Sequence, residues 1–193
     1  MFVGRKNELN LIEDAYRTGK DELVVLYGRR RIGKSSLVKH FAEKKSSFYE
    51  FEALEGETTH RQIEHFSQQL QKQVDDPILD SVRFKNWEQV FTYLTEKIFK
   101  RKTRTKKILF LDELPWMAAG RSRLVSLLKY YWDNHWKGRH VMLILCGSVA
   151  SFMVKKVLQS NALYGRTTLE ILLKGLTPGE AADILSKRSW KKS

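Results

Sequence analysis

The sequence has one cysteine, three prolines and no apolar run of membrane-spanning length. The single Cys146 excludes a disulfide framework, and a transmembrane helix needs roughly 18 or more consecutive apolar residues. The first residues also lack the apolar core of a secretory signal peptide. These absences argue against membrane proteins and disulfide-stabilised secreted proteins. We therefore expect a cytoplasmic protein that has no membrane partner.

Acidic residues are too few to balance the basic ones. The chain has 35 Lys and Arg against 22 Asp and Glu, which gives a formal net charge of +13. Such an excess favours anionic partners such as nucleotides or nucleic acid, and a solvated basic surface explains it equally well. The basic residues gather at 29–31, at 100–107 and from 187 onward. DNA or another polyanion is thus one candidate partner.

The 193 residues correspond to about one domain, in which apolar runs alternate with helical patterns. The runs predict buried strands at 23–27, 48–51, 108–111, 141–146 and 169–173. Helical spacing predicts helices over 34–44, 84–98, 121–136 and 149–158, and Pro178 is expected to open a last helix. Continuous apolar strands separated by helices predict an α/β protein with a parallel sheet covered on both faces.

Residues 28–35, GRRRIGKS, match the phosphate-loop pattern G-x-x-x-x-G-K-[ST] between a predicted strand and a predicted helix. The two glycines let the backbone turn close to phosphate, and backbone N–H groups at the helix start face the anion. Lys34 is expected to reach the β- and γ-phosphates, and Ser35 to offer its hydroxyl to Mg²⁺. The loop therefore predicts a nucleoside triphosphate site, with Mg-ATP as the expected ligand.

The predicted binding set from this segment is Gly28, Arg29, Arg30, Arg31, Ile32, Gly33, Lys34, Ser35 and Ser36. The three arginines occupy variable positions of the pattern. They either help to hold the polyphosphate, contact a partner, or face solvent.

A second strand, 108–111, ends in the carboxylates of Asp112 and Glu113. After a phosphate loop, this pattern is typical of a Walker B element. We expect Asp112 to hold Mg²⁺, directly or through water, and Glu113 to polarise the attacking water. The alternative is a helix N-terminus that is rich in acidic residues.

Two further polar residues lie next to predicted strands. Ser148 follows the strand 141–146, where it either senses the γ-phosphate or caps the next helix. Arg166 precedes the strand 169–173, where it either stabilises transition-state charge, in its own chain or a neighbouring one, or is an ordinary surface residue. The five histidines form no pattern of zinc ligands.

Several motifs together resemble the archaeal-type ATPase family of P-loop proteins, within the AAA+/STAND group. The resemblance covers nearly the whole chain. It is carried, in order, by FVGRKNEL at 2–9, YGRRRIGKS at 27–35, LDELPW at 111–116, CGS at 146–148 and LYGR at 163–166.

The resemblance implies a three-layer, AAA+-like P-loop NTPase fold, with a parallel five-stranded sheet in the order 5-1-4-3-2. It implies that Val3, Gly4 and Arg5 lie near the adenine, that Ser148 is the sensor-1 residue, and that Arg166 falls where relatives place an arginine finger. An ATPase core at 1–175 would then be followed at 176–193 by the start of a helical lid. Because relatives continue into further modules, a protein partner or a homo-oligomer contact through a C-terminal module is also expected.

The function predicted from these features is Mg-dependent ATP binding and hydrolysis by a switch or motor core. Lys34, Glu113 and Arg166 are the predicted catalytic residues. A nucleic-acid-binding module with a regulatory nucleotide is the main alternative. A small-molecule P-loop kinase is disfavoured by the acid pair, and a GTPase by the absence of an N-K-x-D motif.

Overall fold

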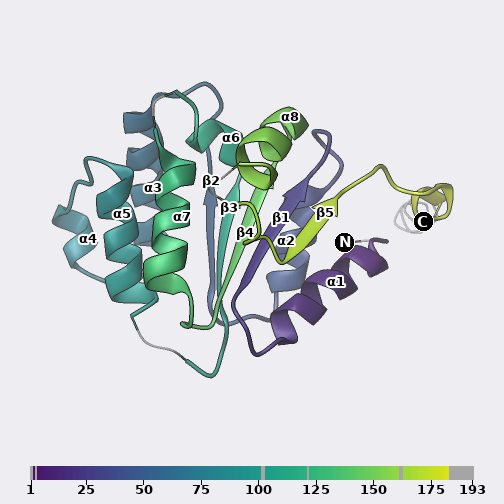
Figure 1. The fold of residues 1–193 in the computed structure, drawn as a ribbon, viewed down its shortest axis with the longest axis horizontal. Coiled ribbons are helices and arrows are strands. Elements are labelled where there is room, and N and C mark those ends of the chain that lie inside the picture. The colour runs from purple at the N-terminus through teal and green to yellow at the C-terminus, as the bar shows by residue number, and fades with distance from the viewer. Residues whose placement is uncertain (1, 3, 101–102, 121, 161–162, 183–193) are drawn as a thin grey trace, which may run out of the picture.

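A five-stranded parallel sheet forms the centre of the computed structural model, which describes residues 2, 4–100, 103–120, 122–160 and 163–182 (Figure 1). The strands are β1 (Glu22–Tyr27), β2 (Phe48–Glu52), β3 (Lys107–Asp112), β4 (Val141–Gly147) and β5 (Leu169–Leu172). Their order across the sheet is β2-β3-β4-β1-β5, and every neighbouring pair is parallel. This is the predicted order 5-1-4-3-2 read from the other end, so the predicted fold class is confirmed.

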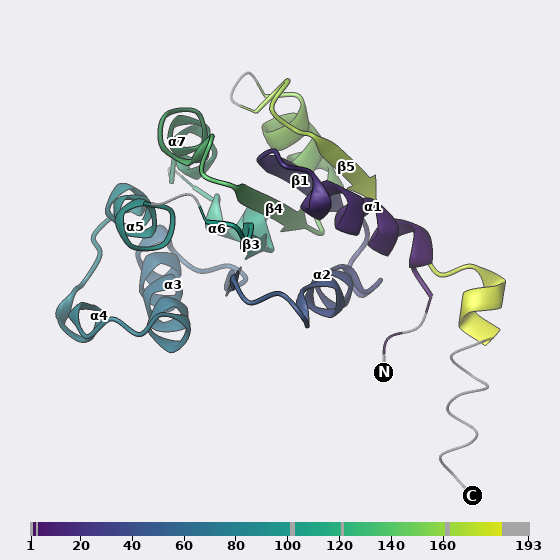
Figure 2. The same cartoon turned by 90° about the horizontal axis from the view of Figure 1, so that it is seen from below.

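Helices cover both faces of the sheet, because alternate residues of the central strands point to opposite sides. Val24 and Leu26 of β1 belong to the core beneath α1 (Lys6–Arg17) and α2 (Lys34–Ala42). Leu23 and Val25 belong to the core on the other face. That face is covered by α3 (Thr59–Gln73), α5 (Trp87–Tyr93) and α7 (Leu124–Tyr131). Figure 2 shows the three layers.

Three of the predicted helices are interrupted by a change of helix type. The helices α5, α7 and α8 (Ala150–Phe152) each continue directly into π-helical turns. These turns are η1 (Leu94–Ile98), η2 (Trp132–Trp136) and η3 (Met153–Leu158). The spacing of apolar residues does not distinguish the two helix types here, since buried positions occur in both.

The structure also contains helices that the sequence patterns above do not predict. These are α1, α3, α4 (Ile78–Ser81) and α6 (Leu114–Met117). Ile12 of α1 is fully buried, and Leu9, Ala15 and Tyr16 pack partly buried against the same core. Pro178 does begin a helical segment, of which residues 178–182 are described. Within the described part of the chain, every helix is too short or too polar to span a bilayer.

The predicted aromatic helix forms core. Trp87, Phe91 and Leu94 are buried on the face covered by α3 and α7. Trp136 is buried beside them, and its indole N–H donates to the buried Thr95 hydroxyl at 2.8 Å. Trp136 therefore avoids the desolvation cost of an unpaired buried donor, whereas the buried indole N–H of Trp87 has no hydrogen-bond partner among the described residues.

Shortening a buried side chain of the central strand β4 is expected to destabilise the protein strongly. Leu143 is fully buried between β1 and β3. We expect Leu143→Ala to lower the free energy of unfolding by about 2–5 kcal/mol, because it removes buried contacts and leaves a cavity. The same change at the exposed Leu11 of α1 is the matched control, with an expected effect within about 0.5 kcal/mol. Urea unfolding of both variants measures the difference, and equal losses would contradict the packing described here.

Candidate functional site

The predicted site residues converge at one edge of the sheet. Parallel strands bring their carboxyl ends to the same edge, and the register pairs Tyr27 with Gly147 and Leu111 with Leu145. The segment 28–35 follows β1, and residues 112–113 and 148 end or follow the two next strands. Three chain segments that are far apart in sequence therefore meet where β1, β4 and β3 end (Figure 1).

The loop at 28–35 turns tightly against the end of β5. A Cβ atom at Gly28 would lie 2.3 Å from the carbonyl oxygen of Leu173, closer than any side chain allows. Gly33, with φ of 92°, is the residue before α2, which begins at Lys34. The loop thus needs glycine at Gly28 for space and at Gly33 for its left-handed backbone.

Lys34 is a buried cation that forms no ion pair with a described residue. Its side chain is 5% exposed, and its ammonium donates to the carbonyl oxygens of Gly28 at 3.2 Å and Arg29 at 2.9 Å. No carboxylate of the described residues lies within ion-pair distance of it. A buried charge is costly unless it is paired. The loop therefore holds a positive charge that an anionic group from outside the chain would complement.

The two predicted acids lie at the end of β3 with different surroundings. Asp112 is 2% exposed, and its carboxylate accepts the backbone N–H of Glu113 at 3.0 Å. Glu113 has φ of 53°, a left-handed backbone that costs roughly 1–3 kcal/mol in a residue other than glycine. This conformation turns the chain away from the strand, so the two carboxylates have separate partners. Burial raises the pKa of the neighbouring Cys146 thiol, and Asp112 adds to this shift, so the cysteine stays uncharged.

Ser148 binds the side chain of Glu113. The carboxylate Oε2 of Glu113 accepts the hydroxyl of Ser148 at 2.8 Å and its backbone N–H at 3.3 Å. The alternative in which Ser148 caps the next helix is wrong, because α8 has Val149 at its N-cap and no side-chain cap bond. The structure therefore joins two predicted site residues that are 35 positions apart.

Arg30 is exposed to solvent, and its guanidinium also contacts neighbouring side chains. Its guanidinium donates to Glu55 Oε1 at 2.8 Å and, more weakly, to Ser148 Oγ at 3.4 Å. Its central carbon lies 5.7 Å from the centre of the Trp116 ring. The hydrogen bond that Arg30 donates to Glu55 raises the pKa of Arg30, and the charges of Glu55 and, less strongly, Glu113 add to this shift. Glu55 was not predicted as a site residue. The one feature of the sequence that could have suggested it is its position just after the strand β2.

Arg5 joins the start of the chain to this loop. Its side chain is buried and donates to the carbonyl oxygens of Ile32 at 3.1 Å and Lys174 at 2.7 Å. Its backbone N–H donates to Glu180 Oε1 at 2.6 Å. Val3 and Gly4 were predicted to lie near the adenine together with Arg5. Gly4 lies against the Glu180 side chain, and Val3 is outside the described residues. The opening segment thus contacts both the loop and the chain that follows β5.

Arg166 lies at the opposite edge of the sheet from the loop. It precedes β5, and the nearby Thr168 bonds Leu23 at the start of β1. Its guanidinium forms a bidentate pair with Asp133, with both N–O distances at 2.8 Å. This pair lowers the pKa of Asp133. Arg166 is therefore not brought together with the loop of its own chain, and its action on a neighbouring chain stays a prediction.

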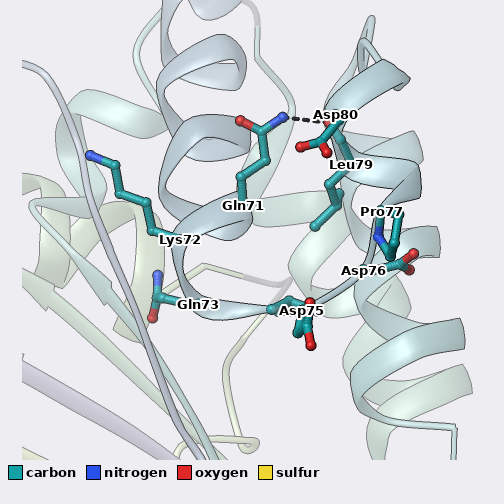
Figure 3. A pocket seen from close by; sticks show the side chains of 9 residues that line it. Gln71, Lys72, Gln73, Asp75, Asp76, Pro77, Leu79 and Asp80 are labelled. Atoms are coloured by element: carbon teal, nitrogen blue, oxygen red, sulfur yellow. Dashed lines mark hydrogen bonds between the residues drawn. The ribbon is translucent and has the colours of Figure 1, made fainter.

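A separate hollow lies at that far edge. It has a volume of about 400 Å³ and lies around the end of α3 and α4 (Figure 3). Its polar lining is Gln71, Lys72, Gln73, Asp75, Asp76 and Asp80. Gln62 at the start of α3 bonds Leu54, just after β2, and Gln73 at its end bonds Glu50 within β2, so α3 runs antiparallel to β2 and ends away from the edge where the loop lies. The hollow contains none of the predicted site residues.

The chain matches a known family of proteins. A family model for an ATPase domain predominantly from Archaea matches residues 2–191. The chain belongs to this family. Membership of an ATPase domain family indicates ATP as the nucleotide.

Two curated relatives come from Methanocaldococcus jannaschii. An uncharacterized protein is 30% identical over 192 residues, which cover 99% of this chain and 40% of that protein. An uncharacterized ATP-binding protein is 51% identical over 45 residues, which cover 23% of this chain and 76% of that protein. This archaeal-type ATPase domain therefore spans less than half of the first relative.

Solved structures share its fold. The Walker-type ATPase of Pyrococcus abyssi aligns with a TM-score of 0.67 and 23% identity, over 99% of this chain and 59% of that one. The ORC2 protein of Aeropyrum pernix, solved as ADPNP–ADP complexes, aligns with a TM-score of 0.64 and 16% identity, over 96% of this chain and 51% of that one.

Gly28 offers a test of the loop geometry. We expect Gly28→Ala to weaken ATP binding and to destabilise the protein by about 1–3 kcal/mol, because the new methyl group must displace the Leu173 carbonyl or the loop. Gly19→Ala is the matched control, since its methyl group would meet open space. Nucleotide titration and thermal unfolding of both variants check this. Unchanged ATP affinity in Gly28→Ala would show that the close approach of Gly28 to Leu173 is not needed for nucleotide binding.

Proposed function

We propose that the domain binds Mg-ATP at residues 28–35 and hydrolyses it as a nucleotide-dependent switch or motor core. The observation that carries this proposal is the buried Lys34 ammonium, which is held by loop carbonyls at the edge where Asp112 and Glu113 lie. A triphosphate supplies the anion that this cation lacks. Backbone N–H groups at the start of α2 add to the attraction for phosphate.

The chemistry of two side chains fits Mg²⁺. Asp112 offers a buried carboxylate at the end of β3, and Ser35 offers a hydroxyl in the first turn of α2. Mg²⁺ in nucleotide sites is usually held by one or two protein ligands together with phosphates and water. The lack of a three-residue metal cluster among the described residues is compatible with such a site. Bound there, Mg²⁺ would neutralise charge on the phosphate oxygens.

The chain's own residues would then carry out hydrolysis. Glu113 would orient a water molecule, whose oxygen attacks the γ-phosphorus while the bond to the bridging oxygen breaks. The bridging electron pair leaves with ADP, and the proton of the water passes through the Glu113 carboxylate to the released phosphate. Ser148, bound to Glu113, would fix that carboxylate, and Lys34 would offset the negative charge on the phosphates.

Contacts of the loop support a role as a switch. Gly28 touches Leu173, and Arg5 connects Ile32 of the loop to Lys174 and Glu180 beyond β5. A change of the loop on nucleotide binding would therefore reach the segment that follows the sheet. Arg166 would act in hydrolysis only at the nucleotide site of a second chain, and its guanidinium would first have to leave Asp133. The basic segments 100–107 and 187–193, which motivate a DNA partner, lie partly or wholly outside the described residues.

Removing the Lys34 ammonium tests nucleotide binding. We expect Lys34→Ala to weaken ATP binding by roughly 10- to 100-fold, the usual size for loss of a charged hydrogen bond. Lys39→Ala, which removes an exposed lysine from the same helix, should leave binding unchanged. Isothermal titration gives both affinities, and circular dichroism confirms folding. ATP binding by a folded Lys34→Ala protein at the parental affinity would refute the proposed site.

Removing the Glu113 charge tests hydrolysis. We expect Glu113→Gln to retain ATP affinity within a few-fold and to lower kcat by about 10²–10⁴-fold, because an amide does not accept the proton of the attacking water. Glu43→Gln, which changes an exposed glutamate at the end of α2, is the control. Phosphate release under saturating ATP measures both. Parental turnover in Glu113→Gln would remove this residue from the mechanism.

A further inference from the structure

A chain of polar contacts connects the loop to the proposed catalytic glutamate. Glu55 accepts from Arg30, Arg30 donates to Ser148, and Ser148 donates to Glu113. The four residues come from the ends of β2, β1, β4 and β3 in turn. Among the arginines that the structure describes, Arg30 is the one whose guanidinium lies within hydrogen-bond distance of the Ser148–Glu113 pair.

Hydrolysis places extra negative charge on the γ-phosphate, and an arginine beside it is a common means of stabilisation. Arg166 is 2.8 Å from Asp133 at the far edge of the sheet, so it does not supply this charge within one chain. We infer that Arg30 is a catalytic residue that contacts the γ-phosphate bound in its own chain, and that Glu55 holds it aside until ATP arrives. This inference rests on the proposed function.

The holding contact is suited to exchange. The Arg30–Glu55 pair has side chains that are 51% and 62% exposed, and exposed ion pairs are weak. A γ-phosphate carries more charge than one carboxylate and fits the two-pronged guanidinium equally well. It would therefore displace Glu55.

Trp116 limits where the guanidinium can move. The centre of the Trp116 ring lies 5.7 Å from the central carbon of the Arg30 guanidinium. Trp116 belongs to α6, the helix that directly follows Glu113. A guanidinium that leaves Glu55 while keeping this ring contact stays beside Ser148.

Arg30→Ala separates catalysis from binding. We expect ADP affinity within about twofold of the parent, because ADP has no γ-phosphate, and a kcat lowered by about 10³-fold or more. Binding of ADP with Mg²⁺ and aluminium fluoride, which imitates the transferring phosphoryl group, should weaken strongly. Arg30→Lys should recover only part of the rate, since lysine lacks the guanidinium fork. Arg17→Ala, which removes another exposed and paired arginine, is the control.

Glu55→Gln tests the holding contact. We expect it to raise the affinity for ATP by several-fold and to leave the affinity for ADP unchanged, because it weakens the competing partner of Arg30. A kcat of Arg30→Ala within threefold of the parent would overturn the inference, as would an equal loss of ADP and ATP binding. If Lys34→Ala still binds ATP, the proposed function fails. If Lys34→Ala and Glu113→Gln behave as expected while Arg30→Ala resembles the parent, only this inference fails.

Discussion

Parallel pairing of β3, β4 and β1 is the constraint on which the site depends. These strands are buried on both faces, so burial alone does not distinguish one register from the next. Polar contacts at the amino edge add the missing information. Asp21 accepts the backbone N–H of Val141 at 2.8 Å, and the Thr168 hydroxyl accepts that of Leu23 at 3.1 Å. The first contact fixes β4 against β1 and the second fixes β5 against β1, so a slip of either strand by one residue would break its contact.

The central strands and the loop were predictable because their signals are local. One apolar run is followed by a segment with glycines, lysine and serine, and another ends in two acids. Each pattern predicts a strand and a chemical role from about a dozen neighbouring residues. The strand order is different in kind, since nothing in the spacing gives it; it came from the family resemblance and is confirmed. The π turns after α5, α7 and α8 have no counterpart in the hydrophobic pattern, because the buried face continues through them.

The partners of charged side chains were the least predictable feature. Glu55 lies 25 positions from Arg30, and Asp133 lies 33 from Arg166. Each acid is unremarkable in its own segment, and only the folded sheet brings it to its arginine. The predicted site therefore gained two residues, Glu55 and Trp116, and it lost Arg166 as a group near the loop of the same chain. The left-handed backbone of Glu113 is equally invisible in sequence, since it belongs to a conformation that glutamate rarely adopts.

The bonds of Arg5 affect how the limits of this domain are drawn. Judged by the sheet alone, the domain begins at β1, and the preceding helix looks like an attachment. Yet a side chain from before α1 is buried between two carbonyls, one in the loop and one beyond β5. A shortened protein that starts at residue 20 would keep all five strands and still lose the side chain that joins Ile32 of the loop to Lys174 beyond β5.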